Sequence, residues 1–71
     1  MFALNTANSD AACSVKLNPL TATAEVWFWA GGPYTYRNVS RLAIVEAIAE
    51  NALFGNVGSV GRWIHENLTS R

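Results

Sequence analysis

The chain has 71 residues, and its five Lys and Arg balance five Asp and Glu, so the formal net charge is zero. Hydrophobic residues make up 51% of the sequence and charged residues 14%. This composition excludes a disordered chain, which needs low hydrophobicity and high net charge. It also disfavours a non-specific nucleic-acid binder, which needs a positive excess.

The first third of the sequence predicts an arm followed by a strand. Residues 1–10 are mostly polar, and we expect an N-terminal arm that is either loose or a short edge strand. Apolar and polar side chains then alternate over residues 12–17. The alternation predicts a half-buried strand with Cys13, Val15 and Leu17 on its inner face.

The strongest strand signal covers residues 21–30, which are rich in β-branched and aromatic side chains. A period of two places Val26 and Phe28 on one face, and Trp27 and Trp29 on the other. Both faces therefore carry large apolar groups. We expect helices to cover one face, and another subunit or a ligand to cover the other.

A glycine-rich turn, Gly31-Gly32-Pro33, predicts a hairpin that leads into a second strand over residues 34–39. Ser40 is a good N-cap for a helix over residues 41–51. The stripe expected to face the core comprises Leu42, Val45, Ile48, Ala49 and Ala52, with Glu46 and Glu50 on the solvent side.

A second helix is predicted from the cap Ser59 to about Leu68, with Val60, Trp63 and Ile64 on its apolar face. Strands followed by helices indicate an α+β fold, a small antiparallel sheet of three to four strands followed by two α-helices. We assign residues 1–10 to the arm and residues 11–71 to a single domain.

The cysteine and histidine content limits the chemistry. With one cysteine and one histidine, Cys13 and His65, the chain cannot form an internal disulfide and is a poor candidate for a structural zinc site. We predict no catalytic residues, no metal and no cofactor.

A domain of this size has a marginal core, so we predict a homo-oligomer. The sequence has no signal-peptide pattern and no stretch of membrane-spanning length, which predicts a cytoplasmic protein without membrane contact.

Two segments are candidates for ligand binding. The run from Gly55 to Arg62 is glycine-rich and opens a helix, and free backbone N–H groups at such a place favour phosphate or carboxylate. Alternatively, the glycines serve only the backbone of a corner between two helices. The hairpin carries Tyr34, Tyr36 and Arg37, which suit base stacking and phosphate contact. The same residue types are also enriched in subunit interfaces.

The run from Val26 to Ser40 (VWFWAGGPYTYRNVS) resembles the KTSC domain, a small module fused to some lysyl-tRNA synthetases and also found alone in bacteria and phages. The family's second signature is similar to Ser59-Val60-Gly61-Arg62-Trp63, where Trp63 replaces the usual Phe. The resemblance covers about residues 11–68. It implies a short sheet followed by two helices, and an RNA-binding role.

Phage sponge proteins of similar build, which sequester nucleotide immune signals without cleaving them, suggest a more specific function. We expect a non-catalytic homo-oligomer that sequesters a cyclic di- or oligonucleotide in the cytoplasm, or in the host cytoplasm if the protein is viral. The residues that we assign to this site are Tyr34, Tyr36, Arg37, Arg41, Ser59, Gly61, Arg62 and Trp63. The alternatives are an RNA- or tRNA-binding module, which zero net charge disfavours, and a protein–protein adaptor that oligomerises through its aromatic sheet.

Overall fold

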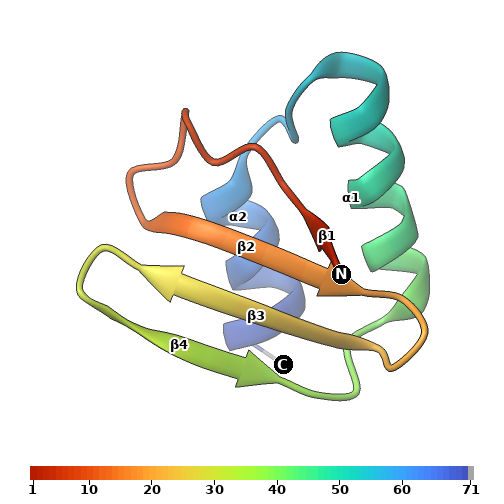
Figure 1. Cartoon of the computed structure of the whole chain (residues 1–71), viewed down its shortest axis with the longest axis horizontal. Helices are drawn as coiled ribbons and strands as arrows, with labels where there is room; N and C mark the ends of the chain where they lie inside the picture. The colour runs from red at the N-terminus through yellow and green to blue at the C-terminus, as the bar shows by residue number, and fades with distance from the viewer. Residues whose placement is uncertain (71) are drawn as a thin grey trace.

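Alternating apolar side chains build the sheet in a computed structural model that describes residues 1–70 (Figure 1). The strands are β1 (Phe2–Ala3), β2 (Ala12–Asn18), β3 (Thr23–Phe28) and β4 (Gly31–Tyr36), all antiparallel in the order β1-β2-β3-β4. The helices are α1 (Arg41–Phe54), α2 (Val60–Ile64) and a π-helical turn, η1 (His65–Thr69). These helices lie behind one face of the sheet in Figure 1. The predicted α+β fold, an antiparallel sheet followed by two helices, is confirmed.

The central strands β2 and β3 supply most of the sheet's share of the core. Val15 lies opposite Val26, and Leu17 lies opposite Ala24; all four side chains are buried. The register of β2 shifts between Ala12 and Ser14. This bulge turns Cys13 out to solvent and puts Ala12 in the core, so the prediction that Cys13 faces inward is wrong.

The N-terminal arm joins the same sheet and core. Phe2 pairs with Leu17 in the β1–β2 ladder, and the Leu4 amide donates to the Val15 carbonyl at 2.9 Å. Leu4 itself is buried among the core residues. Of the two forms expected for this arm, the short edge strand is the one observed.

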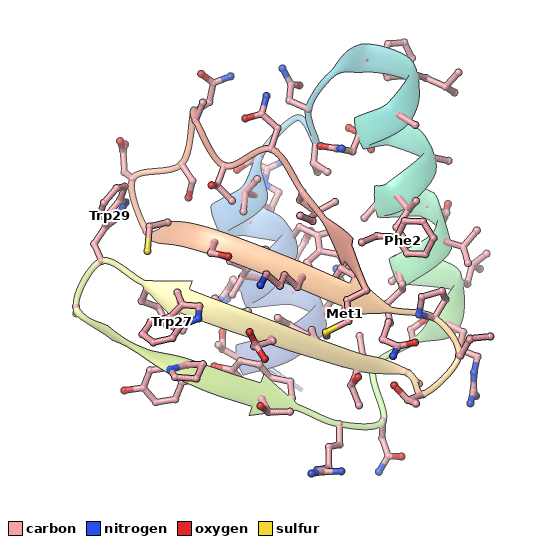
Figure 2. The ribbon with its side chains drawn as sticks, viewed as in Figure 1. Met1, Phe2, Trp27 and Trp29 are labelled. Carbon is pink, nitrogen blue, oxygen red and sulfur yellow. The ribbon has the colours of Figure 1, made fainter. Side chains whose placement is uncertain are left out.

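The predicted hairpin is present, but its bounds differ: β3 is shorter than predicted, and β4 covers Gly31–Tyr36 instead of residues 34–39. The turn therefore lies at Trp29 and Ala30, and the prediction that residues 31–33 form it is wrong. β3 ends at Phe28, and Trp29 lies in the turn with 68% of its surface exposed. Phe28 packs against the core, whereas Trp27 is 40% exposed on the face of the sheet away from the helices (Figure 2). Helices thus cover one face, as expected, and no segment among residues 1–70 forms a second layer over the other (Figure 1).

The first helix begins at the predicted cap, where the Ser40 hydroxyl accepts the Ala43 N–H. It continues to Phe54, three residues beyond the predicted end, and stops at Gly55 in the left-handed region with φ of 79°. This termination at a left-handed glycine is common, because glycine carries no Cβ penalty there.

The predicted core stripe of α1 is wrong except at Ile48: Leu42, Val45, Ala49 and Ala52 are all exposed. Ile44 and Ala47 are the buried residues of the helix, and Ile48 is partly buried against the core. Leu42 and Val45, expected inside, are 70% and 51% exposed. The helix is apolar on nearly every side, so its sequence contains two competing stripes, and contact with the sheet selects the one that contains Ile44.

The second helical segment follows the prediction closely. Ser59 caps α2, the chain remains helical to Thr69 through η1, and Val60, Ile64 and Leu68 are buried. No helix among the described residues is both long and apolar enough to cross a membrane.

Candidate functional site

A small cavity lies where the β1–β2 loop meets the loop between α1 and α2. Its volume is about 220 Å³, and it is lined by Asn8, Ser9, Asp10, Ala11, Val57, Gly58, Ser59, Val60 and Gly61. Sites that bury a drug-sized ligand usually have about 300–1,000 Å³. The cavity of a single copy can therefore admit only part of a nucleotide.

Three of the residues assigned to the ligand site lie at or beside this cavity. Ser59 and Gly61 line it, and Arg62 is the next residue of α2, exposed to solvent. The Ser59 hydroxyl accepts the Arg62 backbone N–H at 3.2 Å, so this oxygen already serves as the helix cap. Asp10 lies on the opposite wall and adds a negative charge, which works against anion binding in the isolated chain.

Loss of the Ser59 cap of α2 is expected to lower the free energy of unfolding by a measurable amount. The variant Ser59→Ala should lower the free energy of unfolding by about 1 kcal/mol, because the Arg62 N–H loses its acceptor. Ser59→Asp should retain the wild-type stability, since a carboxylate is an equally good N-cap. Urea denaturation of the three proteins measures this difference. Equal stability of Ser59→Ala and wild type would contradict the capping role.

The two predicted tyrosines, Tyr34 and Tyr36, lie on the helix side of the edge strand β4. Tyr34 is opposite Val26 and Tyr36 is opposite Ala24, and directly paired residues share a face of the sheet. Tyr34 is 54% exposed, and its ring makes an edge-to-face contact with Phe28 at a centroid distance of 5.6 Å. Tyr36 and Trp63 are partly buried against the core. Tyr34 is thus the aromatic residue of this set that is most open to a ligand.

The arginines Arg37 and Arg41 lie at the other end of the sheet. Arg41 begins α1, and its guanidinium donates to the carbonyls of Pro19 and Leu20 at 3.2 and 3.5 Å. Arg37 directly follows β4, whose exit is fixed to the β2–β3 turn by the hydrogen bond from the Val39 N–H to the Ala22 carbonyl. Arg41 therefore stabilises a turn in this structure.

Within one copy, the eight assigned residues do not converge on one place. The cavity is beside the β1–β2 loop, at the start of β2, and Arg41 contacts the turn at its end. Seven residues of extended strand separate these ends by roughly 20 Å. Tyr34 and Tyr36 belong to β4, two strands away from β2.

The N-terminal wall of the cavity and the contacts that support it were not predicted. The Asn5 backbone N–H donates to the Asn51 Oδ1 at 2.8 Å, and the Asn5 side-chain Nδ2 donates to the Gly55 carbonyl at 2.8 Å. The Glu50 carboxylate, which is partly exposed, accepts the Gly58 N–H at 2.9 Å, a contact that the sequence did not predict. These bonds connect the arm, the end of α1 and the following loop. The polar composition of residues 5–10 was the only available signal.

Cys13 and His65 occupy different elements, β2 and η1. The Cys13 thiol lies 3.4 Å from the Trp27 carbonyl and 3.9 Å from the Phe28 carbonyl. Among residues 1–70, no cluster of three or more His, Cys, Asp or Glu side chains has an arrangement suited to a metal ion.

Comparisons with protein-family models, with curated protein sequences and with solved structures find no match to this chain.

Proposed function

We propose that this chain is a non-catalytic binding protein that acts as a homo-oligomer. The observation that carries the proposal is the number of large apolar side chains at the surface of so small a protein. They are Met1, Phe2, Leu20, Trp27, Trp29, Tyr34, Leu42, Val45, Leu53 and Phe54, each at least 40% exposed. Extensive apolar surface marks interaction sites, and zero net charge leaves association unopposed by repulsion.

The size of the core supports the same proposal. A domain of about 70 residues buries only about 60% of the surface of its unfolded chain, which leaves little stability in reserve. The core here consists largely of alanine and valine, and its largest fully buried side chains are Leu17, Ile44, Val15 and Val26. Burial of apolar surface between copies would add to the stability that this core supplies.

The mass in solution tests the proposal directly. We expect light scattering at micromolar concentration to give twice the 7.7 kDa chain mass or a higher integral multiple. At about 100 μM even a weak complex should be populated, so a monomer at that concentration would reject the homo-oligomer.

A second candidate function is sequestration of a small phosphate-bearing nucleotide between the copies, as the resemblance to KTSC domains and sponge proteins suggests. The observation that favours it is Tyr34, whose exposed ring is held edge-to-face by Phe28 and offers a base a preformed stacking surface. The cavity of about 220 Å³ cannot enclose a cyclic dinucleotide by itself, so a second copy must complete the site.

Arginine substitution tests this second candidate. Arg62→Ala is expected to weaken cyclic dinucleotide binding about 10- to 100-fold, because a charge-assisted hydrogen bond to phosphate contributes about 1.5–3 kcal/mol. Lys16→Ala is the matched control, since it removes one positive charge from an exposed residue of β2. Titration calorimetry with a panel of cyclic di- and trinucleotides measures the affinities. An equal effect of both variants, or no binding by wild type, would contradict the nucleotide site.

A further inference from the structure

The face of the sheet that points away from the helices carries one large aromatic side chain and two opposite charges. Residues that are directly paired across two strands share a face of the sheet. The β2–β3 ladder pairs Ser14 with Trp27, and Lys16 with Glu25. We name this surface the open face of the sheet and define it by Ala3, Ser14, Lys16, Glu25, Trp27 and Thr35.

Trp27 is the large aromatic residue of the open face, and its own hairpin supports it (Figure 2). Its side chain is 40% exposed. A Cβ added to Gly32 would lie 3.5 Å from the Trp27 Cε3 atom, so the ring lies against the backbone of β4. A supported ring loses little conformational freedom on binding, and tryptophan is enriched among the residues that dominate interface energetics. Trp27 is therefore suited to anchor an interface.

We infer that the open face packs against the open face of a second copy, about a two-fold axis that runs parallel to the strands between β2 and β3. The inference rests on the homo-oligomer proposed above and specifies its interface. This axis exchanges the two central strands, so β2 of one copy lies over β3 of the other, about 10 Å away. Each residue of β2 then faces, in the second copy, the residue type that it pairs with in its own ladder.

The residues brought together in this way complement each other in charge and in size. Lys16 faces Glu25 of the second copy, and together with the pairs inside each copy these residues form a square of alternating charge. Trp27 faces Ser14, whose small side chain leaves room for the indole between the two sheets. An isologous contact requires a self-complementary patch, and the β2–β3 ladder supplies one.

Charge selects this axis over the alternative. A two-fold axis across the strands at the level of Lys16 would place each strand over itself, with Lys16 over Lys16 and Glu25 over Glu25. Like charges that face each other across an interface are strongly unfavourable. A partner of a single charge would satisfy only one of these two residues, so their balance favours an identical face.

The size of the open face fits a reversible dimer. Four adjacent strands of about six residues cover roughly 20 Å by 15–19 Å, and their side chains raise the accessible area above this projection. Met1 and Trp29, 62% and 68% exposed, extend the surface at opposite ends of the sheet (Figure 2). Weak complexes bury less than about 1,200 Å² in total, which matches two faces of this size.

Reversal of one charge tests the interface. Lys16→Glu gives the square one positive and three negative corners within each pair of ladders' contacts, and Glu25→Lys does the opposite, so each variant should be monomeric by light scattering at about 100 μM. Neither position is buried, so the far-UV circular dichroism should be unchanged. Glu46→Lys is the matched control, because it makes the same charge change at an exposed residue of α1 and should leave the mass of the dimer unchanged.

Truncation of Trp27 tests the anchor. Trp27→Ala should raise the dissociation constant of the dimer by about 30-fold or more, the effect expected at an interface hot spot. Phe54→Ala is the matched control, because Phe54 is a 74% exposed aromatic residue at the end of α1 and should leave the dissociation constant unchanged. An equal effect of the two truncations would contradict an anchor at Trp27.

Mixing the two charge variants gives the sharpest test. An equimolar mixture of Lys16→Glu and Glu25→Lys should recover the mass of two chains, because opposite charges then face each other at both contacts. Single variants that remain dimeric, or a mixture that stays monomeric, would overturn this interface but leave the homo-oligomer intact. Dissociation by Glu46→Lys as well would attribute the effect to net charge and would likewise overturn the interface. A monomeric wild type would reject both the interface and the homo-oligomer.

Discussion

Replacing Leu17 by alanine is expected to lower the free energy of unfolding by about 2–5 kcal/mol. Leu17 is fully buried at the centre of the core, in β2, where neighbouring strands flank it on both sides. The loss combines the transfer free energy of the removed atoms with the cost of the cavity left behind. For a chain of 71 residues, total stability is on the order of 4–11 kcal/mol, so this single change removes a large part of it.

The matched control is Leu20→Ala, which makes the same chemical change three residues further along. Leu20 is 86% exposed, and we expect its variant to stay within about 0.5 kcal/mol of wild type. Urea denaturation at one fixed protein concentration measures both, since association would make stability depend on concentration. Similar losses for the two variants would mean that β2 does not present Leu17 to the core.

The sheet was predictable because its signals are local. Alternation over two residues is enough to identify the inner faces of β2 and β3, and Val15 and Val26 are buried as the alternation requires. Gly31 and Gly32 correctly indicated a hairpin, although they lie in β4 and the turn itself is at Trp29 and Ala30. Ser40 and Ser59 correctly indicated the starts of both helices. The β-bulge at Cys13 escaped prediction because a register shift depends on the partner strand, which a single strand's sequence does not reveal.

The orientation of α1 was not predictable for a different reason. Ile44, Ala47 and Ile48 form one apolar stripe, and Leu42 and Ala49 contribute to another that is just as apolar. Periodicity identifies an amphipathic helix only when one side is polar. In this helix the choice is made by packing against the sheet, which leaves Leu42 and Val45 exposed.

The candidate site depended on contacts between residues distant in the sequence. Its cavity brings the β1–β2 loop against the loop that precedes α2, supported by bonds such as that from Asn5 to Asn51, 46 residues apart. Local motifs correctly suggested that Ser59 caps a helix. They carried no information on the distance between Ser59 and Arg41, whose guanidinium is bonded to a turn at the other end of β2.

The second large effect is expected at Gly32, near the start of β4. Gly32 has φ of +149°, a conformation that side chains other than glycine rarely adopt. A Cβ added there would lie 3.0 Å from the Val26 carbonyl oxygen and 3.2 Å from the Trp27 Cα, both atoms of the β3 backbone. Gly32→Ala should therefore lower the free energy of unfolding by about 2–4 kcal/mol, through backbone strain together with the steric displacement of β3.

Gly61→Ala is the matched control, because it adds the same methyl group to a glycine in α2 with no atom within 4 Å of the new Cβ. Alanine is the better helix former, so this variant should be more stable than wild type by up to about 1 kcal/mol. Opposite signs for the two substitutions, measured by urea denaturation, would show that the start of β4 requires glycine while the start of α2 does not. If Gly61→Ala were as destabilising as Gly32→Ala, the space beside α2 would have to be occupied, either by protein or by a bound group.

Because Gly61 lines the candidate cavity, the same variant also tests where the ligand binds. A gain in stability together with a loss of nucleotide affinity would locate the ligand in that cavity.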